Sequence, residues 1–213
     1  MKDVILFPFG INAREAVMPI LALNSITSMW KILGFIDDND YLCGKDYCGF
    51  KVLGCVDKLV EFPSAKILAI PGSPSNYGMR REIISRLGVS YDRLATVIDP
   101  TCRIAPDSDI GVNTLVLANV TISCSAVIGD HCVILPNTVI SHDSNIGHYY
   151  LIGSNVSISG SCTVGRNCYI GSGSRIRENV EIGSYAFIGI GSCVIKDVSE
   201  NVTVVGNPAR RIS

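Results

Sequence analysis

Aliphatic residues recur at every sixth position through the second half of the chain. From residue 98 to residue 194, each sixth residue is isoleucine or valine, and a small side chain or a valine follows nearly all of them four positions later, Tyr150 being the bulky exception. A helix repeats every 3.6 residues or so and a strand every two, so neither places β-branched residues at multiples of six for so long. We predict a coil with three flat sides, each side sending one large and one small side chain to the axis.

Glycine has a second, longer period that supports three sides per turn. Two series are spaced eighteen apart: Gly111, Gly129, Gly147, Gly165 and Gly183, and Gly153, Gly171 and Gly189. A corner between sides needs backbone conformations that a Cβ disfavours, so we expect these glycines to stack at corners. No insertion interrupts the repeat, so the second wall of any active site must come from another subunit or from the N-terminal part.

The first part of the chain alternates strand and helix patterns. Residues 4–9, 32–36 and 66–70 are apolar runs typical of buried strands, whereas residues 13–23 and 77–87 have helical patterns. This alternation predicts βαβ units around a parallel sheet. We expect two domains, residues 1–94 and residues 95–213, each large enough to bury a core.

Charge and cysteine content narrow the setting. With 18 Lys plus Arg against 19 Asp plus Glu, the chain offers no basic surface for nucleic acid or an anionic membrane. The N-terminal apolar run is too short for an export signal or a membrane span. The nine cysteines are therefore expected as reduced thiols in the cytoplasm. Cys43, Cys48 and Cys55 lack a Cys-x-x-Cys pair, so we expect no metal there.

The repeat and the end of the chain carry a family resemblance. The segment Val204-Val205-Gly206-Asn207-Pro208-Ala209-Arg210 is similar to the closing segment of the hexapeptide-repeat acyltransferases. Their fold is a left-handed parallel β-helix and their active unit is a homotrimer. The two-domain layout resembles the NeuD/PglD-type sugar acetyltransferases. The expected fold class is thus an α/β Rossmann-like N-terminal domain followed by an all-β left-handed β-helix.

The same resemblance points to the catalytic residues. Residues 141–147, Ser-His-Asp-Ser-Asn-Ile-Gly, are similar to the family's His-Glu/Asp-x-x-Ile-Gly motif, which contains the catalytic base. Acyl transfer needs a base for the proton of the acceptor, and histidine suits neutral pH. We expect His142 as general base with Asp143 as its modulator. Adjacent strand residues point to opposite faces, so Asp143 can reach the imidazole only at a corner.

The family also implies two ligand sites. Some relatives place a second histidine, which contacts the coenzyme, nine residues after the base, where this chain has Leu151. The acetyl-CoA groove is expected beside residues of later coils as well: Leu151, Gly171, Ser172, Gly189 and Ile190. Relatives bind a UDP-sugar at a Gly-x-x-Gly-His-Gly loop, where this chain has Pro8-Phe9-Gly10-Ile11-Asn12-Ala13. Candidate acceptor-binding residues are Gly10, Ile11, Asn12, Asp37, Asp38 and Gly72; the alternative is a packing domain that only positions the acceptor.

The leading hypothesis is acetyl-CoA-dependent N-acetylation of an amino group on a nucleotide-linked sugar. O-acetylation of a sugar, such as a sialic acid, would use the same fold and base. Metal-dependent hydration is a further alternative, since some β-helix trimers hold zinc with three histidines and His131, His142 and His148 are available. A catalytically inactive trimeric scaffold is the last alternative.

Overall fold

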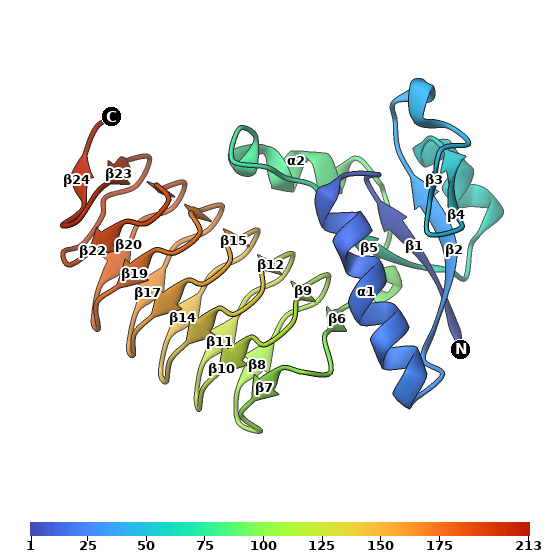
Figure 1. Ribbon diagram of the computed structural model, residues 1–213. Helices are drawn as coiled ribbons and strands as arrows, with labels where there is room; N and C mark the ends of the chain where they lie inside the picture. Colours follow the sequence, from blue (N-terminus) through green and yellow to red (C-terminus); the bar gives the residue numbers. More distant parts are fainter.

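The computed structural model describes residues 1–213, with an α/β domain leading into a long triangular prism (Figure 1). The sheet of the first domain has the order β3-β4-β2-β1-β5, parallel except for the β3–β4 hairpin. The elements are β1 (Lys2–Phe7), α1 (Ile11–Ile26), β2 (Trp30–Ile36), β3 (Asp46–Tyr47), β4 (Phe50–Gly54) and β5 (Lys66–Ala69). The helix expected over residues 77–87 is a 3₁₀ turn, Tyr77–Met79, followed by α2 (Arg80–Ser85). The predicted βαβ alternation is confirmed.

The prism consists of two-residue strands stacked in three parallel sheets. The strands are β6 (Val97–Ile98), β7 (Arg103–Ile104), β8 (Asp109–Ile110), β9 (Leu115–Val116), β10 (Thr121–Ile122), β11 (Val127–Ile128), β12 (Val133–Ile134), β13 (Val139–Ile140), β14 (Asn145–Ile146), β15 (Leu151–Ile152), β16 (Ser157–Ile158), β17 (Thr163–Val164), β18 (Tyr169–Ile170), β19 (Arg175–Ile176), β20 (Glu181–Ile182), β21 (Phe187–Ile188) and β22 (Cys193–Val194). Each strand from β6 to β19 pairs with the strand eighteen residues further along, as Thr121 pairs with Val139. The predicted three-sided coil is confirmed.

The prism has three sides and three edges. Side 1 contains β6, β9, β12, β15, β18 and β21, side 2 runs from β7 to β22, and side 3 from β8 to β20. Edge 1–2 joins sides 1 and 2, edge 2–3 joins sides 2 and 3, and edge 3–1 joins side 3 to the next coil's side 1. Each edge is a column of four-residue turns.

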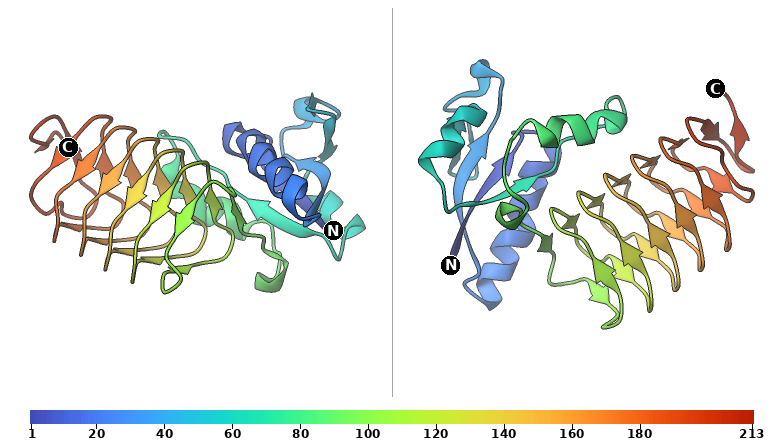
Figure 2. Two further views of the ribbon diagram at one scale, coloured as in Figure 1. Left: turned by 60° about the horizontal axis from the view of Figure 1, so that its bottom comes forward. Right: turned by 180° about the vertical axis from the view of Figure 1, so that it is seen from behind.

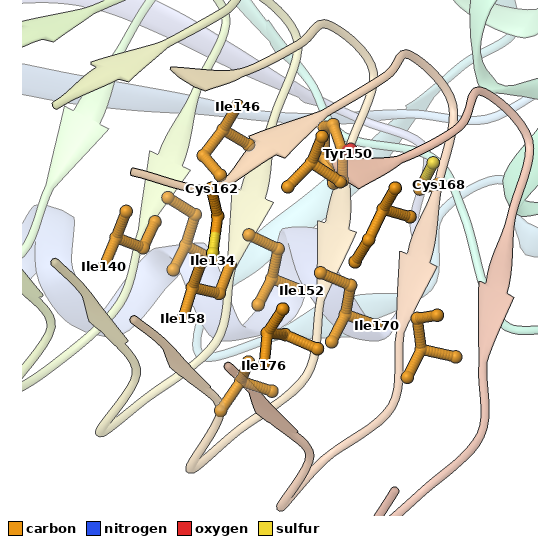
Figure 3. Packing of buried hydrophobic residues seen from close by; sticks show 14 of the residues in the cluster. Ile134, Ile140, Ile146, Tyr150, Ile152, Ile158, Cys162, Cys168, Ile170 and Ile176 are labelled. Atoms are coloured by element: carbon orange, nitrogen blue, oxygen red, sulfur yellow. The ribbon is translucent and has the colours of Figure 1, made fainter. Parts of the chain in front are cut away.

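The sixfold aliphatic residues fill the axis of the prism. Figure 3 shows their side chains converging inside the coils, and those from residue 116 to residue 194 are at most 2% exposed. The small residues four positions later share this core. Tyr150, the bulky exception, is also fully buried, and Cys132 and Cys168 occupy its equivalent positions in the two adjoining coils. Small neighbours above and below therefore make room for one large ring.

The glycines lie at the edges as expected, but the reason they are needed there differs from the one predicted. The eighteen-residue glycine series does not adopt positive φ; a Cβ on Gly147 would instead lie 2.9 Å from the carbonyl oxygen of Gly165 in the next coil. The left-handed conformation falls instead on the third residue of each turn, which is every sixth residue from Asn113 to Gly191. Asparagine, which tolerates positive φ, is common at this third position. The glycines are thus required by close stacking between coils.

The first domain covers side 1. The outward side chains of Leu115, Val133 and Leu151 are buried in one apolar cluster with α1 and with the strands β1 and β2. Figure 2 shows the two domains joined at the N-terminal end of the prism, with α2 extending along it. Further along the same side, Tyr77 packs against Tyr169 and Phe187, and its hydroxyl donates a 3.0 Å hydrogen bond to the carbonyl oxygen of Tyr185. The position of the first domain is therefore set by the outward face of side 1.

The C-terminal end of the prism is closed. Strand β23 (Thr203–Val205) pairs with β21 and is covered by the antiparallel strand β24 (Arg210–Arg211). Side 2 ends on backbone hydrogen bonds between Cys193 and residues Gly206 and Ala209, and side 3 on a bridge between Ile182 and Val198. None of the helices is both long and apolar enough to cross a bilayer.

Candidate active site

His142 projects from edge 2–3, two residues after β13. Its Nδ1 lies 2.7 Å from Oδ2 of Asp143, and both side chains are more than half exposed. The contact is possible because Asp143 has φ +56°, which turns its side chain toward that of its neighbour. A carboxylate acceptor at Nδ1 favours the tautomer with a proton on Nδ1, which leaves the Nε2 lone pair open to solvent. The pair is thus arranged as a base and its orienting acid.

Gly160 lies against the imidazole, one coil further along edge 2–3. A Cβ at this position would lie 2.5 Å from Cε1 and 2.6 Å from Nε2 of His142, so the ring occupies the space of a missing side chain. The Gly160 amide donates no hydrogen bond within the chain. At some matching turns of the other two edges the amide donates to a side chain one coil on, as Ser154 does to Oγ of Ser172 at 3.1 Å. The edge therefore places a buried N–H donor that has no partner in the chain directly beside the exposed imidazole.

The expected coenzyme residues separate into two groups. Gly171, Ser172, Gly189 and Ile190 lie together on edge 1–2, where a Cβ on Gly171 would be 2.5 Å from the amide nitrogen of Ile190. The side chain of Ile190 is 79% exposed. Leu151, by contrast, is 4% exposed beneath the first domain. Its burial argues against contact with a coenzyme, because the outward face of side 1 is used for packing between domains.

The expected acceptor residues gather where β1, β2 and β5 end. The amide of Phe9 donates to Oδ2 of Asp37 at 2.9 Å, and Nδ2 of Asn12 donates to the carbonyl oxygens of Ile70 and Gly72 at 3.0 and 3.1 Å. Gly10 is the N-cap of α1, and Ile11 after it is exposed. Asp38 lies apart from this loop and accepts from the amide of Val56 at 3.1 Å. Carboxyl ends of parallel strands are the usual ligand-binding edge of such sheets.

The three histidines do not share a site within one chain. His131 and His148 lie on edge 3–1, one coil apart, and His142 lies on edge 2–3. Nδ1 of His131 is 2.9 Å from Nδ2 of Asn113, and burial lowers its pKa to about 4. Nδ1 of His148 accepts from the amide of Asp130 at 2.9 Å. No group of three His, Cys, Asp or Glu side chains is arranged to hold a metal ion.

Two residues of structural consequence are not singled out by the sequence patterns. Gly160 has a readable signal, since it stands eighteen residues after His142 in the same column. Arg80, which is completely buried between the two domains, has none. Its acceptors are the carbonyl oxygens of Pro71 and His131, and only the docking of the domains brings these together.

Comparisons with known proteins agree with this architecture. Residues 143–178 match the family model described as bacterial transferase hexapeptide (six repeats). A search among curated proteins found no match. The expected hexapeptide repeat is confirmed.

Solved structures match over the whole chain. A mutant of perosamine N-acetyltransferase from Caulobacter crescentus, in complex with CoA and GDP-perosamine, has a TM-score of 0.86 and 21% identity, covering 100% of this chain and 97% of that one. The acetyltransferase domain of PglB from Neisseria gonorrhoeae FA1090 has a TM-score of 0.85 and 23% identity, covering 100% of both chains. WeeI from Acinetobacter baumannii AYE has a TM-score of 0.79 and 26% identity, also covering 100% of both. The expected fold class, with its left-handed β-helix, is confirmed.

Proposed function

We propose that this protein transfers an acetyl group from acetyl-CoA to an amino group of a nucleotide-linked sugar, with His142 as the general base. The observation that carries the proposal is the exposed His142–Asp143 pair beside the unpaired amide of Gly160. The fold adds support, because the similar structures include complexes with CoA and GDP-perosamine and, for the PglB domain, with acetyl coenzyme A. For acetyl transfer, His142 would be the base and the neighbouring Gly160 amide would be the donor to the oxyanion.

The reaction uses two groups that have no partner in the chain, Nε2 of His142 and the amide of Gly160. Nε2 of His142 takes a proton from the acceptor nitrogen as that nitrogen attacks the thioester carbonyl. The carbonyl oxygen becomes an oxyanion and receives the N–H of Gly160. The intermediate then expels the coenzyme thiolate, which takes the proton back from the imidazolium. Asp143 holds the ring through Nδ1 and stabilises its cationic form.

The site requires a second copy of the chain. His142 is on edge 2–3, the expected coenzyme residues are on edge 1–2, and the acceptor loop is on the domain that covers side 1. One prism cannot bring two different edges together, whereas a cyclic trimer places an edge of one subunit beside another edge of its neighbour. We infer a homotrimer with the coenzyme between subunits. With an acetyl-CoA donor and nine unpaired thiols, the cytoplasm is the expected compartment.

O-acetylation of a sugar would use the same residues and is the second candidate. The test measures CoA release from acetyl-CoA with nucleotide-linked amino sugars and with their hydroxyl counterparts. Turnover restricted to the amino sugars is expected. Acetylation of the hydroxyl compounds alone would replace the first reaction by the second.

Variants test the base directly. His142→Ala is expected to lower kcat by about 100-fold or more, since general base catalysis contributes on that order. His148→Ala, an exposed histidine on edge 3–1, is the matched control and should retain activity. A His142→Ala protein with wild-type turnover would contradict the proposed mechanism and favour a non-catalytic role of this edge.

A further inference from the structure

The end of β5 and the segment after it, residues 69–72, receive several hydrogen bonds from side chains of other elements. Asn113 makes a pair of hydrogen bonds to Ala69, with Oδ1 accepting from its amide at 2.7 Å and Nδ2 donating to its carbonyl oxygen at 2.6 Å. Asn12 donates to Ile70 and Gly72, and Arg80 donates to Pro71. These side chains come from edge 3–1, α1 and α2. The segment is thus a junction between the two domains.

Arg80 is the unusual member of this junction. Its side chain is fully buried, none of the chain's ion pairs includes it, and its Nε has no partner. Burial lowers its pKa to about 10, so it remains charged at neutral pH. A buried charge without a counter-ion is costly, and an apolar residue of similar size would avoid that cost. The guanidinium therefore requires a compensating role.

That role is visible in the acceptors. Nη1 donates to the carbonyl oxygen of Pro71 in the first domain, and Nη2 donates to that of His131 on the prism at 2.6 Å. The planar fork of an arginine can hold two acceptors in a fixed relation, which a lysine cannot. Arg80 thus joins the loop after β5 to edge 3–1.

Gly72 is fitted to the same side chain. It has φ +130°, and a Cβ there would lie 2.8 Å from Nη1 and 3.2 Å from Cδ of Arg80. The backbone of the loop therefore rests directly on the arginine. A side chain at position 72 would therefore displace the guanidinium of Arg80.

We propose that Arg80 is a positioning residue for the acceptor site, holding the Pro71–Gly72 loop at a fixed place relative to the prism that carries His142. The proposal rests on the proposed function for the identity of the acceptor. The loop lies at the carboxyl end of β5, where Asn12 donates to Ile70 and Gly72, and this is the end at which a parallel sheet binds its ligand. In the proposed trimer the base comes from the prism of a neighbouring subunit, and that prism is fixed relative to this one. The loop is therefore fixed relative to the base only if it is fixed to its own prism.

The test compares Arg80→Met and Arg80→Lys with the exposed control Arg86→Met, all in the full-length protein. Both Arg80 variants are expected to raise KM for the nucleotide-linked amino sugar by about tenfold or more, since a displacement of 1 Å or so at a site can cost that much. KM for acetyl-CoA should stay within twofold of wild type. Arg86→Met should match wild type in both constants.

Hydrogen exchange gives a second readout that does not depend on turnover. The peptide containing residues 70–73 should exchange faster in both Arg80 variants, with peptides of side 2 unchanged. Arg80→Lys keeps the charge and serves if Arg80→Met does not fold. Folded variants with wild-type exchange at residues 70–73 and wild-type acceptor KM would overturn the proposal. If wild type acetylates no nucleotide sugar while exchange still rises, the anchoring stands and the proposed reaction fails.

Discussion

The imidazole of His142 rests in the space that any side chain at position 160 would fill. Alanine at that position would place a Cβ 2.5 Å from the ring, far inside the contact distance of two carbon atoms. The ring would have to rotate, and its hydrogen bond to Asp143 would be lost with it. Glycine at 160 therefore allows the imidazole to lie directly against the backbone of the next coil.

We predict that Gly160→Ala lowers kcat for acetyl transfer by about 10- to 100-fold, as expected when a catalytic group is misplaced by an ångström or so. Thermal stability should change little, because the clash can be relieved by an exposed side chain. Steady-state kinetics and thermal unfolding measure the two effects. Glu178→Ala, one coil further along the same column and exposed, should be unchanged; equal activity of Gly160→Ala and wild type would show that the ring has no fixed resting place.

His131 gives the fold a dependence on acidity. Its pKa is lowered from 6.5 to about 4, chiefly by burial; Asp130 opposes this shift, and the charges of Arg80 and His148 add to it. The unfolded chain binds this proton at higher pH than the folded one, so the stability of the fold is complete above pH 6.5 and falls as pH decreases toward 4. Each unit of pKa difference corresponds to about 1.4 kcal/mol.

We predict that His131→Asn flattens the loss of unfolding free energy between pH 6.5 and pH 4. Asparagine already stands at the equivalent turn positions 113 and 167 of edge 3–1 and accepts their positive φ. Urea unfolding across this pH range measures the effect. His142→Asn, at an exposed position of edge 2–3, should keep the wild-type slope, and an unchanged slope in His131→Asn would assign the acid sensitivity elsewhere.

At the scale of the elements, the repeat predicts where the strands lie, but it does not explain why each turn residue is needed. The sixfold aliphatic series predicts the inward residue of every strand from β6 to β22, because the axis of a triangular coil accepts only that spacing. The glycine series suggests a strained backbone at the glycines, whereas the positive φ angles fall on the third residue of each turn, such as Asn113, Asn119 and Asn137. This third position recurs every six residues and can be recognised in the sequence. The close contact between coils that requires the glycines cannot be recognised there, because it depends on how the coils stack.

The two kinds of glycine predict two different costs. Gly165→Ala would place a Cβ 2.5 Å from the amide nitrogen of Ser184, whereas Gly191, with φ +67°, has open space around it. We predict that Gly191→Ala costs about 1–2 kcal/mol for its left-handed conformation. Gly165→Ala should cost clearly more, because two coils must separate. Chemical denaturation of both variants compares them, and an equal loss would mean that the coils adjust freely.

At the scale of the whole molecule, the candidate site is predictable in parts but not in its assembly. The motif around His142 points to the base, and its neighbour Asp143 makes the contact expected of it. Leu151 lies under the first domain rather than in an open groove, because the sequence does not say which side of the prism that domain covers. Arg80 could not be anticipated for the same reason, since its two acceptors belong to different domains.

A composite site predicts complementation between inactive chains. His142→Ala removes the base, and Asp37→Ala removes the carboxylate that holds the first loop through Phe9. If each site takes its base and its acceptor domain from different subunits, every mixed trimer keeps one complete site and should recover about a third of wild-type activity. Co-expression with two affinity tags isolates the mixed species for assay. Mixed trimers as inactive as either parent would place both parts of the site in one chain.

The closed C-terminal end restricts how this molecule can change in length. Strand β24 and the backbone of Gly206, Ala209 and Val198 occupy the last coil, so a new coil cannot be appended there and can enter only between existing ones. Inserting eighteen residues would leave each residue on its own edge, but inserting six ahead of His142 would carry the base round to edge 3–1, to the place that His148 now occupies. Growth of the prism is therefore quantised: whole coils preserve chemistry, and any fraction of a coil relocates it.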